Sequence, residues 1–556
     1  MTKLYSYFIH QFIISAHYIL AYREISLKFI PSGKPRGQSN GGLPRGEAKL
    51  IPLDKPWVHT QGAVKKLNKD LFKINKMNNL NQLLVLLLAL PWILVAKAED
   101  LPDLGERSAT YISPKAEKKL GKEFMKEVRL NVPILTDPII NDYIQNLGDK
   151  LASNANAKNR KFHFFVVNDP TINAFAGPDA NIGVNTGTIT AVGSESELAA
   201  VIAHEIAHVS QHHIERLIRN AKITSMAAMA GALAAIIIGS TSNDRSLGNM
   251  ATGTAMASMG GAAQHMINFT REHEIEADNI GMRILYKSAF DPLAMPNFFG
   301  RMQRLYFNYT SDVPKFLLTH PVTSDRIAES KNRADKFPHK EIKSSKAFSL
   351  IRMRTQILTS NNYPLNTIKQ FQPKLNAKQQ NSEELQYGYA LALYQNLQFT
   401  QAAIITTDLQ QKYPHEVLFK MLAAQLATEN KQLDHALNLL KNELTNHATY
   451  YPLIIQYGQT LIIAKQSQMA CDFIRAKIRL YPNNSGLYRL LAEAYAQNNQ
   501  IADAYQAKAK AYEIDGYGRQ AALLLHQALK TPKLNTTDRA IINARIDQLK
   551  EIDKEE

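Results

Sequence analysis

The chain has 556 residues, of which 45% are hydrophobic and 21% are charged, so two or three domains with hydrophobic cores are expected. Its net charge is +16, but residues 1–76 contain 13 Lys and Arg against 4 Asp and Glu, and the rest of the chain carries only +7. This distribution gives no support to a nucleic-acid-binding body, so no nucleic-acid partner is expected. The single cysteine, Cys471, excludes an intramolecular disulfide and a cysteine-based zinc site.

Residues 77–98, MNNLNQLLVLLLALPWILVAKA, have the pattern of a secretory signal peptide. Lys73 and Lys76 precede an apolar run, Leu83–Ala96, that is too short to span a bilayer comfortably and suits the core of a signal peptide. The residues Ala-Lys-Ala at 96–98 then offer an A-x-A cleavage site. The pattern predicts secretion to the periplasm, and the alternatives are an uncleaved N-terminal anchor or a buried helix.

Residues 1–76 precede this signal and contain the basic, Gly- and Pro-rich stretch PSGKPRGQSNGGLPRGEAK. They lack the pattern of a hydrophobic core, so we expect a disordered segment or a non-native extension, with Met77 as the true start. The alternative is a cytoplasmic tail before a membrane anchor. Secretion together with a single cysteine fits a bacterial periplasmic protein that does not depend on disulfides.

Residues 99–340 are predicted to form an α+β domain that is mostly helical and contains a small sheet. Amphipathic patterns over residues 105–160 predict helices. The apolar run at 162–169, FHFFVVND, predicts a strand, and the alternating pattern at 180–192 predicts one or two short strands with turns.

The next helix contains the sequence VIAHEIAHVSQ at 201–211. Ser194 and Glu197 form a capping box at its start. At about 100° per residue, His204 and His208 fall roughly opposite an apolar stripe. That stripe consists of Leu198, Ile202, Ile206 and Val209. The helix is therefore expected to pack on one side and to present both histidines to a cleft on the other.

His204 and His208 have the spacing of two metal ligands. Residues i and i+4 lie on one helix face, with about 5–6 Å between Cβ atoms, and Glu205 is placed to act as general base. The alternative is a solvated or packed helix face that contains two histidines. His212 and His213 are not favoured as ligands, because His212 lies a further turn along and His213 is rotated off the ligand face.

The following segment, residues 226–263, is rich in Ala, Gly and Met. Small residues allow close packing, so two closely packed helices are one interpretation. The other is a mobile or membrane-touching element beside the site. The apolar runs are too short to predict a spanning helix.

A third metal ligand is expected from REHEIEADNIG at 271–281. Glu274 can complete a His-His-Glu site for one Zn²⁺ per chain, and the fourth position is left for water. Asp278 lies one turn further on and can orient a ligand histidine. Glu272 and Glu276 are less favoured because they point to other faces. The alternative is an ordinary acidic helix with Arg–Glu pairs.

Residues 341–556 are predicted to form an α-solenoid of tetratricopeptide repeats. Small residues recur within YGYAL, LAAQL, YGQTL and LAEAY at spacings of 35, 35 and 34 residues. They are Gly388, Ala423, Gly458 and Ala492. Degenerate units are also expected near residues 345–375 and 517–550. Such a stack buries a continuous core and leaves a concave binding surface, so the small residues are expected to pack helices.

The motifs HEIAH and EIEAD together resemble the HtpX/CAAX-prenyl-protease family of gluzincin metallopeptidases. The sequence INAFAGPDANIGVNTG at 172–187 is similar to the edge-strand region of that family. The sequence THPVTSDRIA at 319–328 resembles its His-Pro-x-x-x-x-Arg segment. The resemblance covers residues from about 105 to 550 and does not cover residues 1–76.

The resemblance implies a gluzincin-type metalloprotease domain with zinc on His204, His208 and Glu274 and with Glu205 as the catalytic base. It also implies that His320 approaches the zinc or the reaction centre. His320 would stabilise the tetrahedral oxyanion or occupy the position of water in a latent state. The alternative is a loop histidine that caps the next helix.

Two further expectations follow from the same resemblance. Arg326 matches the arginine of the later segment, where it supports the site or serves as a structural ion-pair partner. The strand with Ile182, Val184 and Thr186 is expected to hold the substrate backbone by β-addition, so cleavage would favour extended, unfolded segments.

With a signal peptide before the domain and repeats after it, the arrangement is similar to that of periplasmic family members that act on outer-membrane β-barrel proteins. This similarity implies a metalloendopeptidase with chaperone-like activity in the quality control and assembly of these proteins. Unfolded or misassembled outer-membrane proteins and the barrel assembly machinery are the implied partners, and peripheral membrane contact is compatible with it. No set of spanning helices flanks the motif, which argues against prenylated substrates.

Two other functions remain open. One is a mainly non-proteolytic chaperone or scaffold that uses the repeat domain. The other is a membrane-anchored housekeeping protease with unrelated substrates.

Overall fold

The computed structural model describes most of the chain from residue 112 onward. The described residues are 112–157, 160–220, 228–234, 271–308, 315–338, 342–360, 364–376, 382–532 and 534–555. The predicted extension, the predicted signal peptide and most of the Ala-rich segment 226–263 lie outside them. Among the described helices, none combines the length and the hydropathy that a membrane crossing needs.

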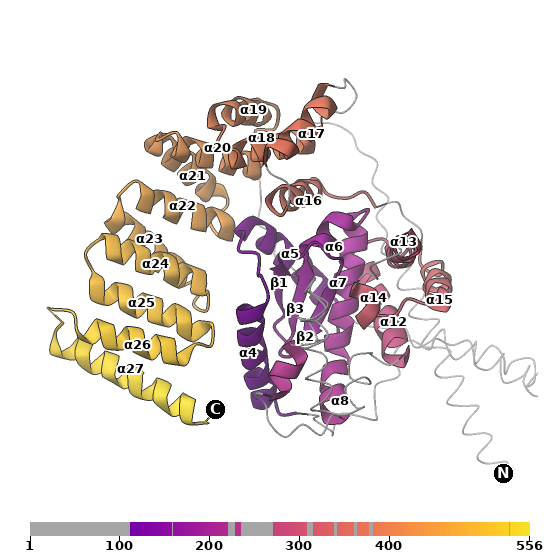
Figure 1. The fold of residues 1–556 in the computed structure, drawn as a ribbon, viewed down its shortest axis with the longest axis horizontal. Coiled ribbons are helices and arrows are strands. Elements are labelled where there is room, and N and C mark those ends of the chain that lie inside the picture. The colour runs from indigo at the N-terminus through magenta and orange to yellow at the C-terminus, as the bar shows by residue number, and fades with distance from the viewer. Residues whose placement is uncertain are drawn as a thin grey trace, which may run out of the picture. The chain divides into compact units, whose positions relative to one another are not determined.

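Two capped helices begin the described chain (Figure 1). Helix α4 (Pro114–Asn131) has Ser113 as its N-cap and proline at its first position. Helix α5 (Pro138–Ala152) repeats this arrangement with Asp137 as its N-cap. The predicted helical region is therefore two separate helices, each started by a side chain that accepts a backbone N–H.

A three-stranded sheet follows, in the order β1–β3–β2. Strand β1 (His163–Val167) pairs in parallel with β3 (Asn181–Asn185), with His163 opposite Asn181. Strand β2 (Ala174–Gly177) pairs antiparallel with the other side of β3. The predicted strand at 162–169 is confirmed, and the region at 180–192 contributes the central strand.

The expectation that Ile182, Val184 and Thr186 form a substrate-binding edge is wrong. Strand β3 is hydrogen-bonded on both sides, so it has no free edge, and Ile182 and Val184 are fully buried. Thr186 begins a helix, α6 (Thr186–Ala191). The hydroxyls of Thr186 and Thr188 donate to backbone carbonyls of the segment that precedes β2. These tertiary contacts override the strand preference of the β-branched residues.

Helix α7 (Glu195–Ser210) carries the histidine motif and is buried on all sides. The side chain of Ser194 accepts a hydrogen bond from the backbone N–H of Glu197, as predicted. The carboxylate of Glu197 accepts from the N–H of Gly193 instead of that of the cap residue. All residues of Ser196–Val209 are buried, so the histidine face is covered by other elements and does not line an open cleft.

Several helices follow α7 in the chain. They are α8 (His213–Asn220), α12 (Arg271–Lys287), α13 (Ala294–Asn308), α14 (Lys315–Thr319) and α15 (Ser324–Ala334). Helix α12 packs along α7, and Gly281 lies where they meet. A Cβ on Gly281 would lie 3.2 Å from backbone atoms of Ala203 and His204, inside ordinary van der Waals contact. This glycine permits the close approach that brings Glu274 and Asp278 to α7.

Helix pairs fill the rest of the described chain (Figure 1). They are α16 (Lys346–Leu358), α17 (Pro364–Asn376), α18 (Glu383–Gln395), α19 (Phe399–Lys412), α20 (Val417–Glu429), α21 (Leu433–Asn446), α22 (Tyr451–Ile463), α23 (Ser467–Ile478), α24 (Ser485–Gln497), α25 (Ile501–Ile514), α26 (Gly518–Leu529) and α27 (Thr536–Glu555). The predicted degenerate units correspond to the first and last of these pairs. The fold is thus α+β and mostly α, with a small sheet followed by an α-solenoid, as predicted.

The backbone confirms the repeat period independently of the side chains. A residue with φ between 58° and 63° recurs every 34 positions in the turn between paired helices, at Leu397, Lys431, Lys465 and Asn499. Gly388 packs as predicted, because a Cβ there would lie 2.5 Å from the sulfur of Met353.

A buried ion pair joins the first of these helices to α5. Arg354 of α16 donates from Nη2 to Oδ2 of Asp137 at 2.7 Å and from Nη1 to the hydroxyl of Tyr387 at 3.1 Å. Asp137 therefore caps α5 and also accepts a hydrogen bond from the guanidinium of Arg354 on α16.

Candidate metal centre

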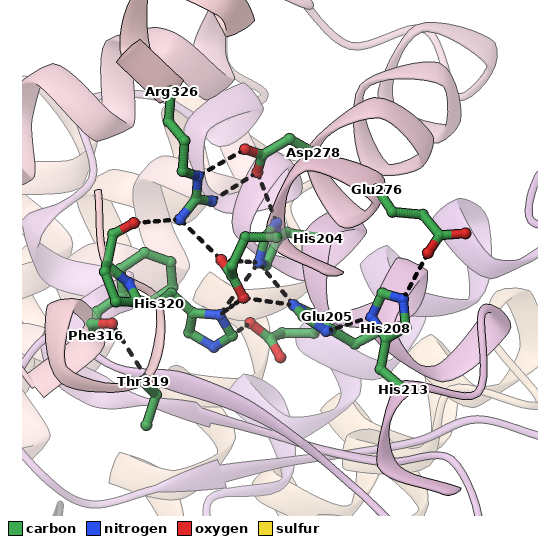
Figure 2. A network of polar contacts seen from close by, with 12 residues as sticks. His204, Glu205, His208, His213, Glu276, Asp278, Phe316, Thr319, His320 and Arg326 are labelled. Carbon is green, nitrogen blue, oxygen red and sulfur yellow. Dashed lines mark hydrogen bonds and ion pairs between the residues drawn. The ribbon is translucent and has the colours of Figure 1, made fainter. Parts of the chain in front are cut away.

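Four buried side chains from three segments converge beside α7 (Figure 2). His204 and His208 come from α7, Glu274 comes from the first turn of α12, and His320 directly follows α14. One donor atom from each side chain lies within 4.8 Å of the other three. The two predicted histidine ligands and the predicted glutamate thus meet, and a third histidine joins them.

Neighbouring donor atoms of the cluster lie 3.0–3.4 Å apart. Nε2 of His204 lies 3.0 Å from Nε2 of His208 and 3.3 Å from Nδ1 of His320. Oε1 of Glu274 lies 3.4 Å from Nε2 of His208 and 3.0 Å from Nδ1 of His320. Tetrahedral ligands with zinc bonds of about 2.0–2.1 Å lie about 3.3–3.4 Å apart. The four side chains therefore lie close enough together to share one metal ion.

Glu205 is fully buried beside this cluster. Among the described residues, no donor meets the usual distance and angle limits for a hydrogen bond to either of its carboxylate oxygens. Nε2 of His320 lies 3.5 Å from Oε1 of Glu205. Burial raises the pKa of Glu205, and the charges of His320 and His204 oppose this rise only in part. A buried carboxylate without a donor is costly, which favours a water or substrate group as its partner.

A carboxylate and a guanidinium orient the first ligand histidine. Nδ1 of His204 lies 3.0 Å from Oδ1 of Asp278. Arg326 of α15 donates from Nε and Nη2 to both oxygens of Asp278 at 2.9 Å, and its Nη1 lies 2.8 Å from Oε2 of Glu274. Asp278 therefore holds the Nδ1–H form of His204, whose Nε2 lone pair faces the cluster. Arg326 contacts both carboxylates and so supports the site directly.

His320 is placed by local packing at the end of α14. Its ring stacks on that of Phe316, with 4.9 Å between centroids, and its backbone N–H donates to the carbonyl of Phe316 at 2.8 Å. The carbonyl of the next residue, Pro321, accepts a hydrogen bond from Nη1 of Arg326 at 2.7 Å. One arginine thereby holds the His320 segment against α12.

Burial and neighbouring charges set the protonation of the cluster. Burial lowers the pKa of His208 to about 3, which leaves the neutral imidazole that a metal requires. Burial would also lower the pKa of His204, but Asp278 and Glu274 outweigh it and raise the pKa to about 10. Burial would raise the pKa of Glu274, but the charge of His320 and hydrogen bonds from the histidines hold it well below its usual range. A cation bound here would replace the proton of His204.

The structure adds two residues that were not favoured from the sequence. His213 lies behind His208, with 2.8 Å between their Nδ1 atoms, and Nε2 of His213 lies 3.1 Å from Oε2 of Glu276 (Figure 2). A continuous helix would turn His213 away from the ligand face. Instead α7 ends at Ser210, His212 adopts a φ of 57°, and α8 begins at His213. No Gly or Pro marks this break in the sequence.

The outer strands of the sheet are β1 and β2, and β1 also bridges to Ile134 through Val167. Helix α7 contacts β2. The backbone N–H of Ala176, in this strand, is among the groups that lower the pKa of Glu205. The outer strand near the cluster is therefore β2, and the predicted residues of β3 and α6 lie one strand further inside.

Comparisons with known proteins show the family to which this chain belongs. Residues 138–334 match peptidase family M48. The β-barrel assembly-enhancing protease of Escherichia coli strain K12 is 31% identical over 457 residues, which are 82% of this chain and 92% of that protein. The protein of the same name from Yersinia pestis is 30% identical over 463 residues, or 82% of this chain and 93% of that protein.

A more distant relative shares the metallopeptidase part. The mitochondrial metalloendopeptidase OMA1 of Schizosaccharomyces pombe is 25% identical over 240 residues, which are 41% of this chain and 64% of that protein. The predicted relationship to a family of metallopeptidases is confirmed. This chain is a metal-dependent endopeptidase of peptidase family M48, and it belongs there with the β-barrel assembly-enhancing proteases.

Proposed function

We propose that this metalloendopeptidase holds one zinc ion per chain on His204, His208 and Glu274 and removes unfolded or misassembled outer-membrane β-barrel proteins in the periplasm. The observation that carries the proposal is the buried cluster of donors with the buried carboxylate of Glu205 beside it. Imidazole and carboxylate donors this close together suit Zn²⁺.

Glu205 is the general base of the proposed reaction. When bound, the zinc supplies Lewis acidity that polarises the scissile carbonyl and lowers the pKa of a water. Glu205 takes the proton of the attacking water and passes it to the leaving amine. Its raised pKa suits both the uptake and the release of a proton. Asp278 and Arg326 keep His204 and Glu274 in position while this happens.

We propose β2, in place of β3, as the strand that receives the substrate. It has a neighbour on one side only among the described strands, and it lies against α7. An extended segment added to this edge would run past Glu205, because the N–H of Ala176 already acts on that carboxylate. Only an unfolded client has a free backbone to pair with such an edge, which favours misassembled proteins as substrates.

His320 takes the fourth ligand position in the proposed resting state. Its Nδ1 lies inside the donor cluster, 3.0 Å from Oε1 of Glu274 and 3.3 Å from Nε2 of His204. This placement favours the latent-state role over stabilisation of an oxyanion. A zinc site with four protein ligands is closed, whereas a catalytic site keeps one position open.

Replacing His320 with Ala is expected to speed the hydrolysis of an unfolded β-barrel protein, because the fourth position opens to water. The rate rises about tenfold if the open state is about a tenth of the wild-type population. The measurement is single-turnover cleavage at fixed zinc, with Thr319→Ala as the neighbouring control. Slower cleavage at unchanged zinc content would assign His320 to the oxyanion instead.

Metal analysis of the purified protein tests the ligand set. We expect about one zinc ion per wild-type chain and clearly less in Glu274→Ala, because the site loses its only anionic donor. Glu272→Ala is the matched control, since Glu272 lies on the same helix but is exposed. A Glu274→Ala protein that retains its zinc would remove Glu274 from the ligand set. A wild-type protein that binds no zinc would refute the proposed centre.

The proposed clients and partners derive from relatives that are named β-barrel assembly-enhancing proteases. In this proposal residues 77–98 direct export, residues 99–340 form the metalloprotease domain, and residues 341–556 form the repeat domain. The helix pairs α16 to α27 would dock a client or the barrel assembly machinery and give the protein its chaperone-like activity.

A chaperone or scaffold with rare proteolysis is the second candidate function. The position of His320 within the donor cluster favours it, because four protein ligands would keep the site closed. The same chain would then act mainly through its repeats. The Glu205→Gln variant separates the two functions, because it removes the general base and leaves the repeats unchanged.

A further inference from the structure

The second ligand histidine has an orienting partner of a different kind from the first. Asp278 contacts Nδ1 of His204 directly, whereas Nδ1 of His208 faces the ring of His213 at 2.8 Å. His213 in turn faces Glu276, with 3.1 Å between its Nε2 and Oε2 of that residue. Figure 2 shows the three side chains in a line that leads away from the cluster.

One arrangement of protons satisfies both of these contacts while His208 binds a metal. A metal on Nε2 leaves the proton of His208 on Nδ1, so Nδ1 donates to His213. Nδ1 of His213 must then accept, which puts the proton of His213 on Nε2. That N–H donates to the carboxylate of Glu276.

Two helices hold this line of side chains in place. His213 starts α8, and its ring stacks on His273 of α12 with 4.4 Å between centroids. Glu276 also lies on α12, where Nη1 of Arg216 approaches its Oε2 at 3.4 Å. His208 and His213 are fully buried, while the side chain of Glu276 is 37% exposed. The line therefore runs from the metal centre to the surface between α8 and α12.

We infer that His213 and Glu276 are positioning residues for the metal centre, and that they fix the Nδ1–H form of His208 with its Nε2 lone pair toward the metal. This inference rests on the proposed zinc site. Partners of this kind typically contribute 10- to 100-fold to metal affinity. Here a neutral imidazole stands between the ligand and the carboxylate, so the negative charge of Glu276 acts at a distance from the metal.

The test compares two replacements of His213 in the full chain by the dissociation constant for Zn²⁺, measured in competition with a chromophoric chelator. His213→Phe keeps a ring to stack on His273 but offers no acceptor to His208. His213→Asn loses the stack but places an amide oxygen near the former Nδ1. We expect the Phe variant to bind zinc about 10- to 100-fold more weakly. We expect the Asn variant to stay within a few-fold of wild type.

A purely structural role for His213 predicts the opposite order, because Phe fills the buried site better than Asn. Glu276→Ala is the second variant, expected to weaken zinc binding about tenfold, and Glu272→Ala on the exposed side of α12 is its control, expected to bind like wild type. Melting of the metal-free proteins in chelator shows whether each variant folds.

Wild-type affinity in His213→Phe, equal weakness of the Asn and Phe variants, or wild-type affinity in Glu276→Ala would each overturn the inference. Loss of folding in His213→Phe leaves the decision to the Asn variant and to Glu276→Ala. If the wild-type chain itself binds no zinc, the proposed metal centre is refuted, and the positioning role of His213 and Glu276 is refuted with it. If only the positioning role is wrong, the wild-type chain still binds zinc and the variants bind it equally well.

Discussion

Glu205→Gln is expected to slow the hydrolysis of an unfolded β-barrel protein by about 10²- to 10⁴-fold and to leave the zinc content unchanged. The amide has the size of the carboxylate but cannot take up the proton of the attacking water. Glu205 is not among the four clustered donors, and its Oε1 lies 3.5 Å from Nε2 of His320. The rate is measured by single-turnover cleavage, and the metal content by elemental analysis of the same preparation.

Glu272→Gln is the matched control, because it makes the same chemical change at an exposed position of α12. Its rate and zinc content should equal those of the wild type. The variants are also tested in cells for assembly of outer-membrane proteins. A Glu205→Gln protein that still degrades its client would refute the assigned base. Lost cleavage with normal outer-membrane assembly would favour the chaperone or scaffold function.

Arg326→Met is expected to lower the free energy of unfolding of the metal-free protein by about 3–5 kcal/mol. The guanidinium is buried and donates to both oxygens of Asp278, to the carbonyl of Pro321 and to Glu274. Methionine fills a similar volume but leaves two buried carboxylates without their cation. Denaturant unfolding in the presence of a chelator measures the change.

Arg333→Met is the control on the same helix, α15. Arg333 pairs with Glu329 one turn away, and the side chain of Glu329 is 44% exposed, so less than about 1 kcal/mol should be lost. Added zinc should reduce the loss in Arg326→Met, because the metal compensates part of the charge of Glu274. Equal stability of the two variants in chelator would show that the buried network does not hold the site together.

The sequence alone was sufficient wherever the determinant is local. His204, Glu205 and His208 lie within five residues of one helix, and a helical period brings the two histidines to one face whatever surrounds them. Ser194 caps that helix by accepting a hydrogen bond from the backbone N–H of Glu197, only three residues further along the chain. The repeats follow from a period of 34 or 35 residues, which the backbone shows again in the left-handed turns between paired helices.

Glu274, Asp278 and Arg326 are a different case. The spacing of Glu274 and Asp278 indicated one face of a second helix, and only a resemblance to a known family connected Arg326 with them. The ion pairs that join Arg326 to both carboxylates span 48 and 52 residues of chain. Such contacts depend on how α12 and α15 pack, which no local pattern encodes.

Three features depend on the tertiary structure, and only the second of them was also expected from the family resemblance. The expectation that β3 is the substrate edge failed because β1 pairs with one side of β3 and β2 pairs with the other, although both strands precede it in the chain. His320 lies in the donor cluster because its ring stacks on Phe316 and because Arg326 donates a hydrogen bond to the carbonyl of Pro321. His213 came to face His208 because the backbone turns at His212. The sequence by itself determined which residues share a helix face, since that needs only the helical period. The tertiary structure decided which faces meet, because that depends on packing between segments far apart in the chain.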